Sequence, residues 1–320
     1  MRVIRSLHSV RVRRPLCLAM GVFDGVHLGH QAIVSTAVNM AEKDGVAAAV
    51  LTFDPHPDDV LSPAGAPPLL TTTEEKLDLL RSLGVQVVII VPFTRSFADT
   101  PAEEFIAEVL GKRLRACYAV VGESWRFGAR GKGNLRLLQT MGARIGFQVC
   151  GVGRVKHAGQ LVSSTRIRAL LSRGHVSAAN ALLGRPYHIR GEVVAGAGRG
   201  QTLGFPTANL STPPEKLLPA DGVYACMAGV RKLLPAVASI GVRPTFERGG
   251  ERRVEVHLLD PRRPPQLLGR RLHIQLIARL RGERRFSSAE ALVRQMQADC
   301  QRARQTLAGK PLARRPPRTR

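Results

Sequence analysis

The first half of the chain alternates short apolar runs with segments of helical periodicity. Apolar runs typical of buried strands occupy residues 16–20, 46–52, 85–91 and 117–121. Between them, apolar residues recur every three or four positions, as at 33–41, and a capping sequence at 71–75 starts a further helix. Another helix is expected to start at Thr100, with Pro101 as its first residue. This alternation predicts an α/β domain built on a doubly wound parallel sheet.

The second half reads as a series of strands separated by glycine and proline. Strand candidates occupy residues 188–195, 222–230, 233–242, 253–259 and 272–280, and a helix is expected from about 287 to 306. In the fourth strand, apolar residues alternate with Glu255 and His257, so that one face is apolar. Serial strands of this kind predict a small antiparallel β-barrel domain with a C-terminal helix. The expected domains are therefore 1–182 and 183–308, followed by a tail at 309–320.

The charge of the chain lies largely at its ends. The 320 residues carry a formal net charge of +24. Residues 1–20 hold five arginines and no acid, and residues 300–320 hold seven basic residues and no acid, so the two ends supply 12 of the excess charges. The basic, proline- and arginine-rich tail is expected to be disordered. Such charge can attract RNA non-specifically, but it predicts no specific nucleic-acid partner.

The sequence predicts a cytoplasmic protein. The five scattered cysteines form no CxxC pair, which fits a reducing compartment and argues against structural zinc. No apolar run approaches the roughly 18 residues of a membrane span. The arginine-rich start is superficially similar to a transit peptide, but apolar residues from Val3 to Val12 can supply core contacts, so we interpret it as part of the mature protein.

The segment 21–31, GVFDGVHLGHQ, is the strongest candidate for chemistry. It joins the first predicted strand to the first predicted helix, and a helix start offers free N–H groups and a positive dipole end to anions. His27 and His30 are three residues apart, so both can face one ligand there. A two-histidine metal site and a tight turn with surface histidines are the alternatives; we favour phosphate chemistry.

The HxGH arrangement resembles the motif of the nucleotidyltransferase superfamily. The longer pattern GxFDGxHxGHQ is similar to that of the bacterial bifunctional riboflavin kinase/FAD synthetases. The resemblance implies a Rossmann-like nucleotidyltransferase domain in which His27 and His30 are catalytic. The residues that it implies for ATP or phosphate binding in this motif are Gly21, Phe23, Asp24, Gly25 and Gly29. From its residues alone, the segment 52–57, TFDPHP, is equally a proline-stiffened loop or a ligand contact, and its similarity to an FxPHP loop of the same family favours ligand contact.

Two further segments of the first half match this family. In 162–168, VSSTRIR, the serines are natural helix caps. The resemblance to the superfamily's SSTxIR element implies phosphate contacts by Ser163, Ser164, Thr165 and Arg168, with Arg166 as the second choice.

Segment 122–134, GESWRFGARGKGN, can close over a flavin or a triphosphate, with a solvated loop as the alternative. Its resemblance to the family pattern GxDFxFGxxxxG implies flavin contacts by Ser124, Trp125 and Phe127. Ser124 stands where Asp or Asn is usual, and Trp125 where Phe is usual.

The glycine-rich segment 196–209, GAGRGQTLGFPTAN, lacks the GK[ST] ending of a Walker A loop. Thr207 and Asn209 carry neutral oxygens that suit a magnesium ion bridging nucleotide phosphates. The string GRGQTLGFPTANL resembles the riboflavin kinase motif over its whole length. The resemblance implies ATP or phosphate binding by Gly198, Gly200, Gly204 and Pro206.

Strings at 222–224, 240–246 and 255–260 also resemble the family. The resemblance implies that Glu255 is the general base for the riboflavin hydroxyl, since kinases need a carboxylate within reach of the nucleophile. From the residues alone, Glu255 is more simply a surface glutamate on a half-exposed strand. Arg281 and Phe286 match a C-terminal element that the family places near the flavin.

The resemblance covers residues 1–308 and implies a bifunctional enzyme. The second domain would convert riboflavin and ATP to FMN and ADP, and the first would convert FMN and ATP to FAD and diphosphate. ATP is the implied co-substrate, and Mg²⁺ or another divalent cation is the implied cofactor. A kinase-only enzyme, suggested by Ser124, and a basic RNA-binding protein on the same scaffold are the alternatives. The sequence does not indicate an oligomeric state.

Overall fold

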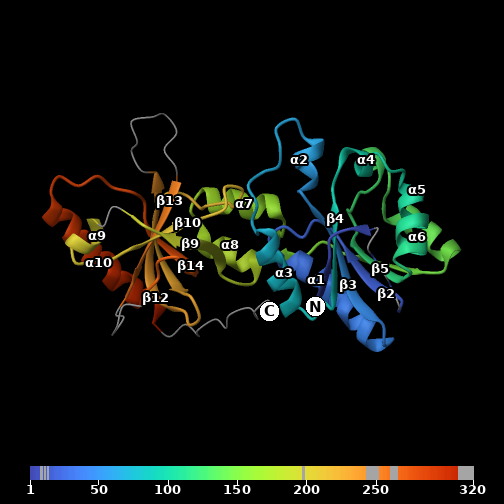
Figure 1. Cartoon of the computed structure of the whole chain (residues 1–320), viewed down its shortest axis with the longest axis horizontal. Helices are drawn as coiled ribbons and strands as arrows, with labels where there is room; N and C mark the ends of the chain where they lie inside the picture. Colours follow the sequence, from blue (N-terminus) through green and yellow to red (C-terminus); the bar gives the residue numbers. More distant parts are fainter. Residues whose placement is uncertain are drawn as a thin grey trace. The chain divides into compact units, whose positions relative to one another are not determined.

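The computed structural model describes residues 1–7, 10, 12, 14–196, 199–242, 252–259 and 266–308 (Figure 1). Contacts divide the chain into two compact units, the first ending at Ser163 and the second beginning at Ser164. The second unit therefore begins earlier in the sequence than the expected domain boundary at 182/183. Gly198, the expected tail at 309–320 and the end of the string 240–246 lie outside the described residues.

The first unit is built on a parallel sheet whose strand order is β1-β4-β3-β2-β5-β6. The strands are β1 (Arg2–Ile4), β2 (Leu16–Met20), β3 (Ala47–Asp54), β4 (Val87–Pro92), β5 (Ala116–Gly122) and β6 (Gln148–Val152). The central strand β2 is buried along its whole length. Its alternate residues enter two separate cores, with Leu18 in one and Ala19 in the other. The predicted doubly wound sheet is confirmed.

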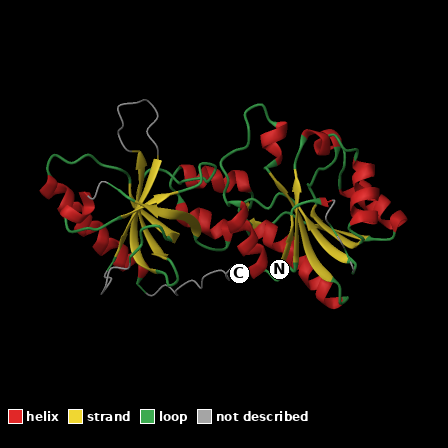
Figure 2. Ribbon diagram, in the orientation of Figure 1, coloured by secondary structure: helices red, strands yellow, loops and turns green. Residues whose placement is uncertain are grey.

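Helices cover both faces of this sheet (Figure 2). On one face lie α1 (Leu28–Lys43) and α3 (Thr73–Ser82), which share a core. On the other lie the π-helix η2 (Phe105–Arg113) and α6 (Leu135–Ile145). The shorter helices are α2 (Pro57–Leu61), α4 (Arg95–Ala98), α5 (Ala102–Glu104) and η3 (Ala129–Gly131), and β7 (Lys156–His157) pairs with β8 (Gln160–Leu161).

Local sequence signals account for most helix starts in the first unit. The capping box of α3 forms as predicted, with Thr72 and Glu75 exchanging hydrogen bonds. The helix expected from Thr100 differs, because it begins at Ala102 with Pro101 as its cap and no side-chain capping bond. The side chain of proline has no hydrogen-bond donor or acceptor. Pro101 therefore restricts the backbone φ angle before the helix but cannot cap the helix with a side-chain hydrogen bond.

The second unit is a closed antiparallel barrel with the strand order β10-β13-β12-β11-β14-β9. The strands are β9 (Tyr187–Val194), β10 (Ala208–Ser211), β11 (Gly222–Gly229), β12 (Leu234–Val242), β13 (Arg252–Leu258) and β14 (Arg271–Arg281). The predicted barrel is confirmed, with β10 as an additional strand.

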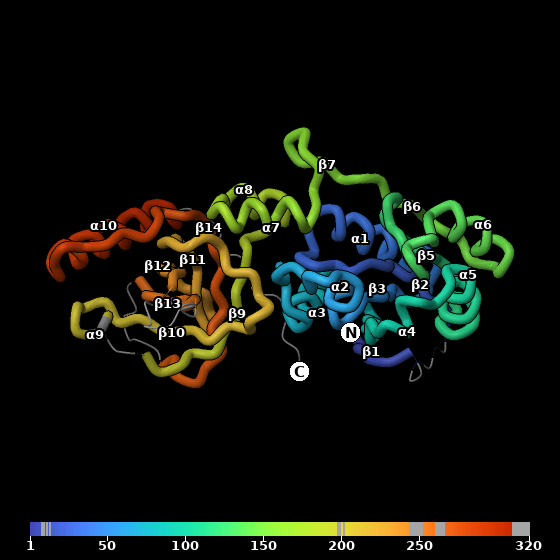
Figure 3. Tube along the Cα trace, turned by 90° about the horizontal axis from the view of Figure 1, so that it is seen from above, coloured from blue at the N-terminus to red at the C-terminus, as the bar shows by residue number. Residues whose placement is uncertain are grey.

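Helices flank the barrel. The pair α7 (Ser164–Ser172) and α8 (Val176–Leu183) precedes it, and α9 (Arg199–Thr202) follows its first strand. The last helix, α10 (Ala289–Leu307), packs against the outer face of the wall (Figure 3), where Cys300 and Ala303 share a core with Ala225 and Met227 of β11.

Candidate active sites

The turn between β2 and α1 brings the two predicted histidines together. His27 caps α1, and its Nδ1 accepts a 3.2 Å hydrogen bond from the backbone N–H of His30. The two rings stack with centroids 3.6 Å apart and an interplanar angle of 14°. A Cβ on Gly29 would lie 3.2 Å from the His27 ring, so glycine makes room for that ring. The first turn of α1 thus presents both imidazoles beside a positive helix end.

The preceding residues of the motif turn inward. Phe23 and Val26 are buried and have φ values of 54° and 38°, a conformation that costs non-glycine residues about 1–3 kcal/mol. The Asp24 carboxylate is 2% exposed and accepts hydrogen bonds from Leu70 N, Thr71 N and Thr71 Oγ1 at 3.0–3.2 Å. The side chains of Phe23 and Asp24 are thus buried in the protein, and their contact with phosphate stays a prediction.

The C-terminal end of β3 lies beside this turn, as expected for neighbouring parallel strands. Thr52 Oγ1 donates a 3.0 Å hydrogen bond to the carbonyl oxygen of Val22. Farther along, His56 caps α2 by accepting from Asp58 N. The Thr52 side chain thus connects the TFDPHP segment to the backbone of the first motif.

The VSSTRIR segment spans the division between the units. Within the first unit, the carbonyl oxygen of Val162 lies 4.0 Å from the position of a Cβ on Gly29, so Ser163 follows directly on a residue next to the histidine motif. Ser164, Thr165 and Arg168 belong to α7 in the second unit. Their contact with phosphates bound at the histidines stays a prediction.

The loop after β5 presents an aromatic pair. Phe127 is buried and exchanges backbone hydrogen bonds with Gly133, at 3.2 and 2.8 Å. The half-buried Trp125 stacks on Phe127, with centroids 4.7 Å apart. Ser124 is exposed. Of the three expected flavin contacts, Phe127 packs beneath Trp125 and Ser124 is open to solvent, and the contacts themselves stay predictions.

In the second unit, strand register places the candidate kinase residues in one row. Asn209 of β10 pairs with Glu255 of β13, which pairs with Ser239 of β12. Ser239 pairs with Val223 of β11, which pairs with Arg281 of β14. Directly paired residues on neighbouring strands point to the same face. This cross-strand row follows the outer face of the barrel wall.

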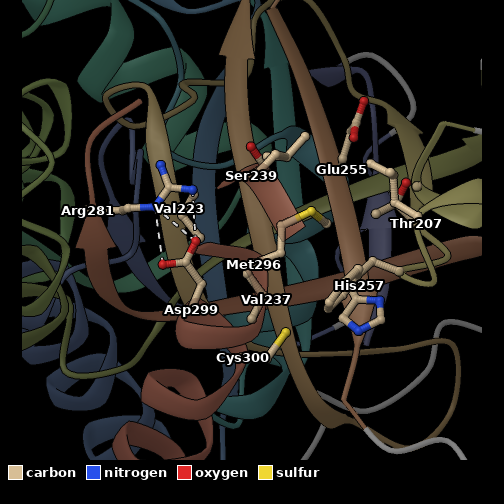
Figure 4. A pocket seen from close by; sticks show the side chains of 14 residues that line it. Thr207, Val223, Val237, Ser239, Glu255, His257, Arg281, Met296, Asp299 and Cys300 are labelled. Atoms are coloured by element: carbon tan, nitrogen blue, oxygen red, sulfur yellow. Dashed lines mark hydrogen bonds and ion pairs between the residues drawn. The ribbon is translucent and has the colours of Figure 1, made fainter. Parts of the chain in front are cut away.

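A cavity of about 240 Å³ lies over the cross-strand row (Figure 4). Its polar side includes Thr207, Ser239 and Glu255, and Val237, Met296 and Cys300 contribute to its apolar side. Gly200 and Arg281 also line it. Among the described residues expected at this site, Gly204, Pro206, Asn209 and Phe286 do not line it.

An ion pair closes one side of this cavity, on the left in Figure 4. Arg281 donates from Nε and Nη2 to Asp299 of α10, with Nε–Oδ2 and Nη2–Oδ2 distances of 2.9 and 2.8 Å. Gln295 Nε2 donates to Asp299 Oδ1 at 2.9 Å, and Arg281 lies over the Phe286 ring. Sequence reasoning missed Asp299 and Ser239. The available signal for Asp299 was an acid at a core-facing position of the last helix.

The oxygen donors near this cavity fit a hard cation. A Cβ on Gly200 would lie 3.0 Å from Thr207 Oγ1, so the glycine allows the loop to approach that hydroxyl. Asn209, adjacent to Glu255, adds an amide. These neutral groups suit Mg²⁺ held mainly by nucleotide phosphates. Over the described part of the chain, no group of three or more His, Cys, Asp or Glu side chains is placed to hold a metal.

Two family models match the chain. The FAD synthetase model matches residues 10–166, and the riboflavin kinase model matches residues 183–307. The bifunctional riboflavin kinase/FMN adenylyltransferase of Escherichia coli strain K12 is 38% identical over 303 residues, with 93% of this chain and 96% of the relative covered. That of Bacillus subtilis strain 168 is 37% identical, with 89% and 90% covered. The chain belongs to the bifunctional riboflavin kinase/FMN adenylyltransferase family, as its motifs predicted.

A solved structure agrees with the fold. A crystal structure described as a macrolide-efflux protein from Streptococcus pneumoniae matches 94% of this chain with a TM-score of 0.85 and 32% identity, and 98% of that chain is covered. Its description concerns that protein alone. None of the helices in the described ranges is both long and apolar enough to cross a membrane.

Proposed function

We propose that this chain carries out both activities named by its family, one in each unit. The barrel unit transfers the γ-phosphoryl group of ATP to riboflavin, giving FMN and ADP. The α/β unit joins FMN to the adenylyl group of a second ATP, giving FAD and diphosphate. The order of the two matched family models supports this division. ATP is the co-substrate of both reactions.

The cross-strand row carries the proposal for the kinase half. Glu255 takes the proton from the 5′-hydroxyl of riboflavin, and the resulting oxygen attacks the γ-phosphorus of ATP while the bond to ADP breaks. The neighbouring Ser239 and the Arg281–Asp299 pair border the space in which the flavin is held. Thr207 and Asn209 would hold Mg²⁺ or another divalent cation, which when bound neutralises phosphate charge.

The stacked histidines carry the proposal for the adenylyltransferase half. An FMN phosphate oxygen attacks the α-phosphorus of ATP and diphosphate leaves, with no covalent enzyme intermediate. Because His27 Nδ1 accepts from His30 N, the proton of its neutral ring is on Nε2. His27 therefore donates to phosphate through Nε2, and the start of α1 stabilises the same charge. We also assign the phosphate contacts in α7 to Ser164, Thr165 and Arg168.

The direct test is flavin turnover by the purified chain. Incubation with riboflavin, ATP and Mg²⁺, followed by separation of the flavins, should yield FMN and then FAD. Absence of FMN would contradict the proposal. FMN without FAD would favour the kinase-only alternative, for which Ser124 is the specific observation. An RNA-binding protein would instead show salt-sensitive RNA affinity and no flavin turnover.

The variant His30→Ala tests the assignment of one activity to each unit. Loss of one stacked imidazole at the helix start should abolish FAD formation from FMN, because transition-state charge loses a donor. FMN formation should be unchanged and serves as the control for folding. If both activities fall together in a folded variant, the assignment of one activity to each unit is wrong.

We further propose a cytoplasmic location. The five cysteines are all free thiols, which suits a reducing compartment. Thiol titration of protein purified from cytoplasm without reductant should find all five reduced. Recovery of a stable disulfide would contradict this location.

A further inference from the structure

A charged side chain lies buried beneath the strand-to-helix turn of the first unit. Lys76 belongs to α3 and is 7% exposed. Its Nζ donates a 2.9 Å hydrogen bond to the carbonyl oxygen of Val22. Lysine is almost never buried to this degree without a partner for its ammonium group. The mechanism proposed above gives Lys76 no part, so its burial requires a separate explanation.

The carbonyl that Lys76 contacts is held from two sides. Thr52 Oγ1 at the end of β3 donates to the same Val22 oxygen at 3.0 Å. This oxygen belongs to the peptide unit immediately before Phe23, whose φ is 54°. Thr52 of β3 and Lys76 of α3 therefore fix the orientation of the peptide group between Val22 and Phe23. Phe23 is the residue with the positive φ value. That residue starts the turn leading to His27 and His30.

Acidic groups accompany the buried lysine. Burial lowers the pKa of Lys76, and the charges of Asp24 and Asp54 oppose this shift without cancelling it. Asp24 accepts from the backbone N–H groups of Leu70 and Thr71, just before α3. The segment from Leu70 to Lys76 thus holds the turn at two points, through Asp24 and through the Val22 carbonyl.

We propose that Lys76 is a positioning residue for adenylyl transfer, which it serves by fixing the Val22 carbonyl and hence the turn that carries both histidines. This inference rests on the proposed assignment of adenylyl transfer to the first unit. A methionine at this position has a similar length but no donor. Displacement of reacting groups by about 1 Å can cost about 10²-fold in rate.

The experiment compares Lys76→Met with the wild-type full chain. FAD formation is measured from supplied FMN and ATP, and FMN formation from riboflavin and ATP. We expect kcat for FAD formation to fall about 10- to 100-fold, with KM for FMN and ATP changed less than about threefold. FMN formation should be unchanged. Lys76→Arg retains a cationic donor and should recover part of the lost kcat.

Two further variants separate positioning from packing. Lys112→Met removes an exposed lysine whose Nζ lies 2.6 Å from Glu108, and it should affect neither activity. Thr52→Val removes the second donor to Val22 at nearly constant volume. If both residues act through one carbonyl, the double variant should lose less kcat than the product of the single losses. Thr52→Val also carries the test if Lys76→Met fails to fold.

A folded Lys76→Met variant with FAD-forming kcat within about threefold of wild type would overturn the inference. Independent effects of Lys76 and Thr52, or a rise in the KM for ATP alone, would also contradict it. His30→Ala, assayed in parallel, separates this failure from that of the underlying assignment. If His30→Ala leaves FAD formation intact, the assignment of adenylyl transfer to the first unit is at fault.

Discussion

Glu255 lines the cavity of the proposed kinase site because of the two-residue period of a strand. Val254 and Val256 on either side of it are buried, whereas Glu255 is exposed on the outer face. The carboxylate is adjacent to Asn209 and Ser239 through strand pairing. A base on a paired strand is held more rigidly than one on a loop, which suits proton transfer over hydrogen-bond distance.

Glu255→Gln preserves the shape of the side chain and removes the base. We expect kcat for FMN formation to fall by about 10²- to 10⁴-fold, the usual contribution of a general base. FAD formation from supplied FMN should be unaffected, and separation of flavins after each reaction measures both. Glu192→Gln, on β9 and outside the cavity lining, is the matched control. Near-normal FMN formation by Glu255→Gln would exclude its role as the base.

At the residue scale, sequence patterns predicted which residues lie at the strand-to-helix turn better than they predicted the direction of their side chains. The spacing of His27 and His30 predicted a shared position at a helix start, and the structure places both there. The same motif gave no sign that Phe23 and Asp24 point inward. The direction of Phe23 depends on its positive φ, and that of Asp24 depends on partners at Leu70 and Thr71, about 46 residues away in the sequence.

At the scale of elements, the last helix completes one side of the cavity in the second unit, where we propose that the flavin binds. Asp299 of α10 binds Arg281 of β14, and the Arg281 and Asp299 side chains are only 11% and 3% exposed. Gln295, one helical turn earlier, holds the same carboxylate. Removal of one partner from such a buried pair leaves an uncompensated charge.

Asp299→Asn should therefore destabilise the second unit and weaken flavin binding. We expect a loss of about 3–5 kcal/mol in the free energy of unfolding, together with a raised KM for riboflavin because Arg281 is no longer fixed. Denaturant unfolding and steady-state kinetics measure the two effects. The double variant Arg281→Met/Asp299→Leu should regain stability without regaining riboflavin affinity. Equal riboflavin KM in Asp299→Asn and wild type would contradict the positioning of Arg281.

Elements with strong local patterns were predicted, and a short one was not. The apolar strand β4 and the capped helix α3 lie where the sequence indicated. Strand β10 has only four residues, of which only Leu210 is buried, so it has no periodic signal of its own. Its pairing with β9 and β13 depends on barrel closure, which a local pattern does not report.

At the scale of the whole molecule, α8 belongs to the compact unit that contains the barrel. Asn180 donates to Leu276 O at 2.9 Å and accepts from Tyr187 N at 2.7 Å. Leu171 of α7 accepts from Ala220 N. Backbone groups of two barrel strands therefore depend on a helix that precedes the riboflavin kinase match at residue 183.

A chain that begins at Ser164 should accordingly be more stable than one that begins at residue 183. The shorter chain loses at least the two hydrogen bonds of Asn180, each worth about 1 kcal/mol, and the apolar contacts of α8. Thermal unfolding compares the two, and riboflavin phosphorylation reports whether the barrel folds. Equal melting temperatures would show that α7 and α8 are dispensable for the second unit.

If the cross-strand row has the proposed role, the same strand register determines both the folding of the barrel and its activity. A shift of β13 by one residue would send Glu255 into the packed interior and expose Val254 and Val256. The alternation of apolar residues in β13 favours the native strand register, and this register also places Glu255 in the cross-strand row. Misregistered molecules would be both unstable and inert, so quality control that removes unstable chains would also remove the inactive ones.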